Sequence, residues 1–259
     1  MNFCSAGYDR IVVRPNGNIS RCYSRSEVIS TIYNFDYNQL NPKTCNQINC
    51  GLCDQRNNTI KPNIDQIIRR KFDIQLVITE QCFHQCHYCT HSDRAQKYNK
   101  PISVIPMNHF VQFLNKIDSS NVIIIGGEPT LRDDISELFV IQKHNFIMFS
   151  AWLYTKKIQQ IIDSTNETET KLYLKVTMHP YAKDFNLERF WNNIELTLNQ
   201  SKNIKIIGIY LLNYKIRNII IDVKNKCKEL GIPFKLKPVD LSVVSERYDY
   251  SNQEIFNKL

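Results

Sequence analysis

Strand-like and helix-like segments alternate along residues 72–239, and this alternation constrains the fold more than any other feature of the sequence. Short apolar runs rich in β-branched and aromatic residues predict strands at 72–79, 121–127, 146–150, 171–178, 204–212 and 233–239. Between them, apolar residues at helical spacing predict helices at 104–117, 133–144, 152–163, 187–200 and 214–230. Strands that alternate with helices form right-handed crossovers and a parallel sheet, so the fold class is α/β.

The length of this alternating region limits the architecture. It holds six predicted strands in about 170 residues, whereas an eight-stranded barrel takes about 250 residues. A six-stranded partial barrel or an open sheet therefore fits the sequence. In either form, functional residues gather where the parallel strands end.

The first 60 residues differ from the rest because they are rich in cysteine and poor in helical pattern. The apolar run 11–13, the turn formers at 15–17 and the residues that follow predict a β-hairpin. We therefore expect a small Cys-rich β-hairpin domain (1–60), an α/β core (61–240) and a C-terminal tail (241–259).

The chain of 259 residues contains nine cysteines, and eight of them lie before residue 90. Disulfide-rich scaffolds are usually smaller, secreted and evenly paired. The N-terminus has no basic segment followed by an apolar one, and no apolar run reaches the roughly 18 residues of a membrane span. We therefore expect a cytoplasmic protein without a membrane partner, whose cysteines bind metal or act in redox chemistry.

Three cysteines follow the first core strand at the spacing Cys82-x3-Cys86-x2-Cys89. Three thiolates so close together are able to wrap one soft metal centre. A tetrahedral zinc site needs a fourth ligand, which a histidine between residues 84 and 91 is placed to supply. An iron–sulfur cluster with three cysteines instead leaves one iron open, and the spacing alone does not separate the two.

A second motif, Gly126-Gly127-Glu128-Pro129, ends the second core strand. Adjacent glycines at a strand end let a ligand approach the backbone closely. The carboxylate that follows them is suited to an ammonium group. This context favours an iron–sulfur cluster with a bound cofactor over zinc.

The CxxxCxxC motif, with Tyr88 before its last cysteine, and the GGEP motif together resemble the radical S-adenosylmethionine (SAM) enzymes over about residues 70–240. The resemblance implies a (β/α)6 partial TIM barrel and a [4Fe–4S] cluster with SAM at its open iron. One electron would cleave SAM to a 5′-deoxyadenosyl radical that takes hydrogen from the substrate. The implied metal ligands are Cys82, Cys86 and Cys89, and the implied SAM-binding residues are Tyr88, Gly126, Gly127, Glu128, Ser150 and Thr177.

Two of these SAM contacts, Ser150 and Thr177, have an equal alternative. Both are hydroxyls at strand ends, and such hydroxyls also bond to nearby backbone groups. The Asn-Gly pair that the family often has after the third strand is replaced here by Ala151-Trp152. Contacts to the SAM ribose therefore differ from the family pattern.

The N-terminal cysteines resemble the SPASM and twitch extensions of radical SAM enzymes, which hold auxiliary [4Fe–4S] clusters. Cys4 and Cys22 flank a glycine at the family spacing, and Cys45, Cys50 and Cys53 follow. The extension precedes the core here, and five cysteines suffice for one cluster rather than two. The resemblance implies ligation by Cys4, Cys22, Cys50 and Cys53, with Cys45 as the alternative ligand. A structural zinc site is the other interpretation.

Substrate contacts are expected beyond the ends of the fourth and fifth strands. His179 and Tyr181 follow the fourth strand, and Tyr210 lies near the end of the fifth, which makes these three the catalytic candidates. Lys175 shares a strand face with Thr177 and is interpreted as a surface lysine.

The sequence thus predicts a radical SAM enzyme that modifies a ribosomally made peptide or another natural product, with flavodoxin or ferredoxin as electron donor. A dehydrogenase or epimerase of a sugar or nucleotide is the alternative within the class. A zinc-binding module that binds nucleic acid or senses redox state is the alternative from another class. The net charge of +8 comes from scattered residues, so we expect a peptide or small-molecule substrate and no nucleic-acid partner.

Overall fold

The computed structural model describes most of the α/β core and parts of the N-terminal region. The described residues are 3–4, 10–22, 27–36, 40, 43–44, 72–84, 104–180, 185–211 and 217–236. They form a nine-stranded sheet and a separate two-stranded sheet. The predicted domain boundaries near residues 60 and 240 lie outside the described residues.

Six strands of the large sheet run parallel in the order β11-β10-β9-β8-β7-β6. Their bounds are β6 (Phe72–Thr79), β7 (Ser119–Gly126), β8 (Asn145–Ser150), β9 (Leu172–Met178), β10 (Ile204–Leu211) and β11 (Phe234–Leu236). This confirms the predicted α/β class with a mostly parallel sheet. Closure into a partial barrel stays a prediction.

Three N-terminal strands extend this sheet beyond β6. β2 (Arg10–Val13) pairs in parallel with β6, and β3 (Asn18–Ser20) and β4 (Val28–Thr31) follow in antiparallel order. Gly17 makes the turn between β2 and β3 with a φ of +80°, a backbone conformation that glycine adopts without strain. The predicted hairpin strands are thus joined to the core sheet, and their membership of a separate Cys-rich domain stays a prediction.

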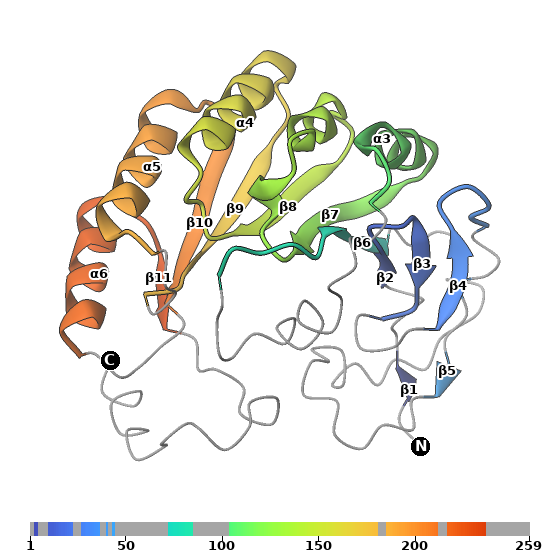
Figure 1. Cartoon of the computed structure of the whole chain (residues 1–259), viewed down its shortest axis with the longest axis horizontal. Coiled ribbons are helices and arrows are strands. Elements are labelled where there is room, and N and C mark those ends of the chain that lie inside the picture. Colours follow the sequence, from blue (N-terminus) through green and yellow to red (C-terminus); the bar gives the residue numbers. More distant parts are fainter. Residues whose placement is uncertain are drawn as a thin grey trace.

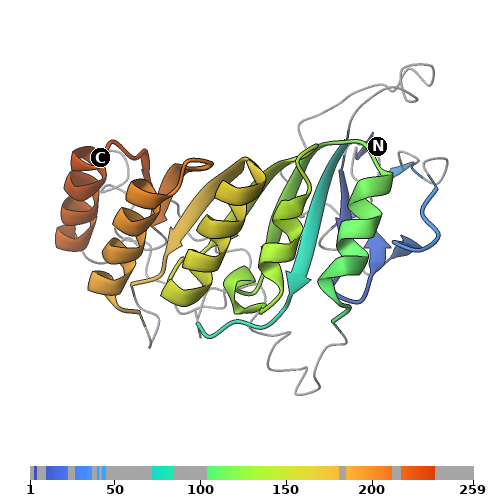
Figure 2. The same cartoon turned by 90° about the horizontal axis from the view of Figure 1, so that it is seen from above.

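Among the described residues, four α-helices cover one face of the sheet. They follow one another along its curved surface (Figures 1 and 2). Their bounds are α3 (Met107–Lys116), α4 (Thr155–Thr168), α5 (Leu187–Gln200) and α6 (Arg217–Glu229). In the part of the chain that the structure describes, no helix has the length and apolar character needed to cross a bilayer.

The helix predicted at 133–144 is wrong in type and length, because the chain forms a 3-10 helix, η3 (Ile135–Val140), there. Its buried residues Ile135 and Leu138 are three positions apart, and three residues per turn bring such positions to one side. The preceding Asp134 makes no side-chain capping bond to η3. A short 3-10 turn therefore buries the apolar residues of this connection.

The helix predicted from residue 152 begins three residues later, at Thr155. Trp152 has a φ of 55°, in the left-handed region, and a residue in that conformation does not join a right-handed helix. Its indole is fully buried. The side chain therefore anchors the connection between β8 and α4 instead of belonging to the helix.

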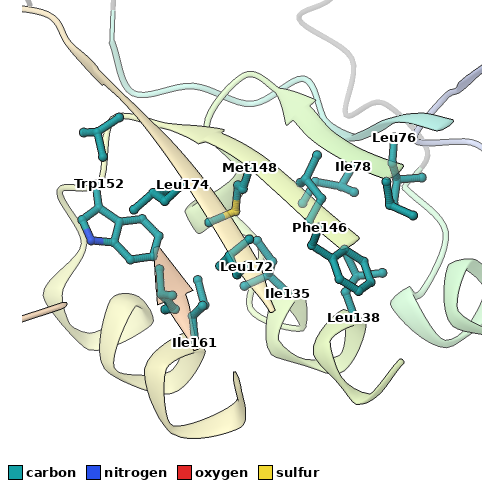
Figure 3. Close-up of a cluster of buried hydrophobic side chains, with 14 of the residues drawn as sticks. Leu76, Ile78, Ile135, Leu138, Phe146, Met148, Trp152, Ile161, Leu172 and Leu174 are labelled. Atoms are coloured by element: carbon teal, nitrogen blue, oxygen red, sulfur yellow. The ribbon is translucent and has the colours of Figure 1, made fainter. Parts of the chain in front are cut away.

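The core lies between the sheet and the helices, as Figure 3 shows. Residues of β9 alternate between buried and half-buried along the strand, and the buried ones face α4. The sheet therefore has one face sealed by helices and one that keeps partial contact with solvent. Buried residues between this face and the helices include Phe146, Met148, Trp152, Ile161, Leu172 and Leu174.

Candidate active site

The loop after β6 lies across the carboxyl ends of neighbouring strands (Figure 1). Phe83 packs against Tyr154, which follows β8, with ring centroids 4.8 Å apart. His84 packs against His179, which follows β9, with ring centroids 5.0 Å apart. In the sheet, β7 lies between β6 and both β8 and β9. The loop therefore passes the end of β7, and Cys82 lies at the edge where the parallel strands end.

Cys82 is half-buried, and it is the one predicted cluster ligand of this motif that lies within the described residues. Cys86, Cys89 and Tyr88 lie outside them. Among the described residues, no three His, Cys, Asp or Glu side chains are grouped as a metal site. Thiolates are the usual ligands of an iron–sulfur cluster, so the three cysteines of this motif fit such a group. The first of them, Cys82, lies at the edge where the parallel strands end.

Gly126 and Gly127 let the end of β7 lie against the start of the cysteine loop. The N–H of Gly127 donates to the carbonyl of Thr79 (2.9 Å), and the N–H of Glu128 donates to the carbonyl of Gln81 (2.8 Å). A Cβ on Gly126 would lie 2.1 Å from the Thr79 carbonyl oxygen, and one on Gly127 would lie 2.0 Å from that of Gln81. The close approach is thus made by the chain's own backbone, and ligand contact at these glycines stays a prediction.

Glu128 is buried at the same edge, with 2% of its surface exposed. Its Oε1 accepts hydrogen bonds from the hydroxyl of Ser150 (2.6 Å) and from the hydroxyl (2.5 Å) and N–H (3.1 Å) of Thr130. Its Oε2 accepts one from the N–H of Ala151 (2.7 Å). One carboxylate therefore connects the end of β7 to the end of β8.

Burial raises the pKa of Glu128 above its ordinary value of 4.5, and the hydrogen bonds from Ser150, Thr130 and Ala151 oppose that effect without cancelling it. A carboxylate oxygen has two acceptor positions, and Oε2 accepts one hydrogen bond from the described residues. A cationic ligand at the second position would stabilise the ionised form. The site therefore suits an ammonium group.

Ser150 is engaged by the protein itself. Its hydroxyl donates to Glu128 and accepts from the N–H of Trp152 (2.9 Å). The indole N–H of Trp152 in turn donates to Thr197 on α5 (2.8 Å), and its carbonyl accepts from the Asn193 amide (3.0 Å). Buried hydrogen bonds thus fix the turn after β8 from both sides, and a contact between Ser150 and SAM stays a prediction.

Thr177 and Tyr210 are register partners on neighbouring strands. They lie on the face of the sheet opposite the helices, together with Lys175 and Lys235. The Nζ of Lys175 lies 4.8 Å from the ring centre of Phe149, and that of Lys235 lies 5.7 Å from the ring centre of Tyr210. Lys175 is half-buried on this face, so its interpretation as a surface lysine stays a prediction.

Sequence reasoning did not find Lys235 because no motif surrounds it. The one signal is the register that pairs Lys235 with Tyr210 across β11 and β10. Lys175 was visible through its alternation with Thr177, but its burial depends on the ring of Phe149 in the neighbouring strand. Both lysines are thus placed by strand pairing.

His179 lies beside His84 at the end of β9. Desolvation and the neighbouring imidazole of His84 lower the pKa of His179 to about 3. His179 is therefore neutral near pH 7, able to accept or donate one hydrogen bond but not to supply a positive charge. Tyr181, the other candidate after this strand, lies outside the described residues.

The N-terminal cysteines are described in part. Cys22 follows β3 and is half-buried. Cys4 belongs to β1 (Phe3–Cys4), which pairs antiparallel with β5 (Lys43–Thr44). Cys227 of α6, by contrast, is fully buried, and burial raises the pKa of its thiol to about 11, as befits a core residue. Outside the described residues lie Cys45, Cys50 and Cys53.

No protein-family model matches the chain. Curated relatives share the name GTP 3′,8-cyclase. The enzyme of Pasteurella multocida is 36% identical over 76 residues, which are 28% of this chain and 22% of that enzyme. The enzyme of Aquifex aeolicus is 24% identical over 68% of this chain and 50% of its own length, and the probable enzyme of Methanococcus aeolicus is 23% identical over 70% and 64%.

The chain thus spans between about a fifth and two thirds of the relatives that it matches. These relatives are radical SAM enzymes, and their similarity at low identity extends over much of the chain. The cysteine loop, the GGEP turn and the parallel sheet meet at one edge, as the resemblance implies. The chain is therefore similar to the radical SAM enzymes, at low identity over much of its length.

Proposed function

We propose that the chain binds a [4Fe–4S] cluster through Cys82, Cys86 and Cys89 and holds SAM beside it. When bound, this cofactor pair supplies one-electron cleavage of SAM to a 5′-deoxyadenosyl radical that takes hydrogen from the substrate. The observation that carries the proposal is the buried carboxylate of Glu128, which lies at the strand edge where the cysteine loop begins.

The chain's own residues orient the SAM methionine in this proposal. Glu128 accepts the ammonium at Oε2, while Thr130, Ser150 and Ala151 hold the carboxylate in place. The cost of burying an ionised carboxylate is then offset by the ligand's charge. Gly126 and Gly127 fix the turn against the cysteine loop, and Tyr88 lies near the adenine.

The face of the sheet opposite the helices is the proposed substrate side. Lys175 and Lys235 make it cationic, while Thr177 and Tyr210 add hydroxyl groups. Such a set favours an anionic small molecule, and the relatives are named for an activity on GTP, a nucleotide. We therefore favour a nucleotide-like substrate, and modification of a ribosomally made peptide, the first expectation, draws no support from these relatives.

A second [4Fe–4S] cluster is proposed for the N-terminal region, on Cys4, Cys22, Cys50 and Cys53. The pairing of β1 with β5 brings the backbone at Cys4 next to Lys43. Cys45 follows β5 by one residue, so the pairing supports Cys45 as the alternative ligand. Flavodoxin or ferredoxin is the proposed electron donor, in the cytoplasm.

Metal analysis of the full chain, purified without oxygen, tests the proposal. We expect a brown protein with about eight irons, four for each cluster. A colourless protein with stoichiometric zinc would refute the enzyme and favour the zinc module. About four irons, all lost when Cys82, Cys86 and Cys89 are replaced together, would refute the N-terminal cluster alone.

A second test of the proposed function measures the product of SAM cleavage. With a reductant and SAM, the protein should release 5′-deoxyadenosine, and Cys86→Ala should abolish that release. Cys227→Ala is the matched control, because it removes a buried thiol of α6 without touching either proposed cluster. Equal loss in both variants would mean that the release depends on folding and not on the cluster.

A further inference from the structure

Arg132 is a buried charged residue that the proposed chemistry does not use. Its side chain is 8% exposed and makes four hydrogen bonds. Two of them form a bidentate pair with the carboxylate of Asp134 (2.7 and 2.6 Å). The pair uses Nε and Nη2 and neutralises the buried guanidinium, which leaves Nη1 and the second hydrogen of Nη2 to bond elsewhere.

The other two bonds of Arg132 reach two segments that are far apart in the sequence. One outer nitrogen donates to the carbonyl of Ile78 in β6 (3.0 Å), and the other donates to the carbonyl of Ile105 just before α3 (3.1 Å). The three cysteines of the CxxxCxxC motif all lie between Ile78 and Ile105. A single planar group thus bonds to the backbone on both sides of the cysteine segment.

Asp134 strengthens the same junction. Its Oδ2 accepts a hydrogen bond from the N–H of Met107, the first residue of α3 (3.1 Å), in addition to the bond from Arg132. The arginine lowers the pKa of the Asp134 carboxyl despite partial burial, so the carboxylate is ionised near pH 7. β6, the turn after β7 and the start of α3 therefore meet at one ion pair.

We propose that Arg132 is a positioning residue of the cluster site, holding the two ends of the cysteine segment at a fixed separation. The inference rests on the proposed function, because it assigns a purpose to the segment between those ends. Fixing both ends of a segment reduces the conformations that its thiolates explore, which favours binding of a cluster that needs all three. Lysine cannot replace the planar fork, because it is a single point charge.

The test measures iron loss to a chelator, under anaerobic conditions, from the reconstituted full chain. Arg132→Met should lose iron about 10-fold faster than the wild type, as is typical when a group that supports metal ligands is removed. Arg132→Lys should lie between the two. Ile161→Ala is the matched control, since it opens a cavity under α4 and destabilises the fold without touching either end of the segment.

Equal rates of iron loss in Arg132→Met and Ile161→Ala would overturn the proposal, because the effect would then follow global stability alone. If Arg132→Met does not fold, the comparison is made with Arg132→Lys, and a wild-type rate in that variant overturns the requirement for a fork. A wild type that binds no iron would refute the proposed function. Hydrogen exchange of the cluster-free protein then decides the role of Arg132, with faster exchange at Ile105 and Met107 expected in Arg132→Met and unchanged exchange contradicting it.

Discussion

Two neighbouring residues of β9, Leu174 and Lys175, display the difference between the faces of the sheet. Leu174 faces the helices and is fully buried, whereas Lys175 faces the other way and is half-buried over the ring of Phe149. An apolar core excludes an uncompensated ammonium group, and the open face tolerates one. One strand thus separates the residues that stabilise the fold from those available to a ligand.

Replacing the helix-facing residue gives the largest expected effect. Leu174→Ala should lower the free energy of unfolding by about 2–5 kcal/mol, because it removes buried methyl groups and leaves a cavity. Urea unfolding measures the change. A loss below about 1 kcal/mol would mean that the two faces are packed alike.

Gly127→Ala tests the packing at the edge of the sheet where the parallel strands end. The new Cβ would meet the Gln81 carbonyl at 2.0 Å, so backbone must shift, and we expect a loss of about 1–3 kcal/mol in urea unfolding. Gly208→Ala is the control, because its nearest neighbour is the side chain of Tyr210 at 3.1 Å. Similar losses in both variants would contradict a special requirement for glycine at the edge.

Glu128→Gln tests how the stability of the fold depends on pH at this edge of the sheet. Burial raises the folded-state pKa of Glu128 above 4.5, so the folded protein holds the proton over a range in which the unfolded chain has released it. The contribution of Glu128 to stability is therefore full below pH 4.5 and falls as the pH rises through the folded-state pKa. In urea unfolding, the wild type should lose this increment as the pH rises above 4.5, and the variant should not.

The difference between wild type and Glu128→Gln isolates this carboxyl. His179, with its pKa lowered to about 3, acts in the opposite direction below pH 6.5, but it is present in both proteins. The lowered pKa of Asp134 matters below its ordinary value of 3.8, outside the measured range. Parallel stability curves for the two proteins would contradict a raised pKa.

Lys175→Met has the smallest expected effect on stability, within about 0.5 kcal/mol, because it keeps the apolar stem on the open face. Binding of GTP, measured by calorimetry, should weaken about 10-fold if the lysine meets a phosphate. Lys205→Met, an exposed lysine near the start of β10, serves as the control. Equal GTP affinity in all three proteins would remove the lysine from the proposed substrate side.

The strands were predictable because buried parallel strands leave continuous apolar runs, and IKIIGIYLL needs no long-range information to be read as one. The connection at 133–144 was not, because apolar spacings of three and four residues fit a 3-10 turn and an α-helix alike over so few residues. The start of α4 depended on the left-handed backbone of Trp152, a conformation rare for a bulky residue.

In the candidate site too, features within one short segment were predictable from the sequence, and contacts between distant segments were not. The cysteine and GGEP motifs are local, and their meeting at one edge follows from strand order. The role of the glycines depends on the backbone of Thr79 and Gln81, and Arg132 bonds to residues 54 and 27 positions away. Hydrophobic periodicity carries no information on such bonds, so a buried arginine reads in the sequence as a surface one.

The pairing of β2 with β6 has a consequence for how the protein is made and dissected. β2 can pair with β3 as soon as both are made, but its pairing with β6 waits for a strand that begins about 60 residues later in the chain. A chain shortened to the α/β core would present β6 as a bare strand edge, with N–H and C=O groups open to any other chain. The N-terminal strands therefore protect the core from self-association, a role that is independent of any metal.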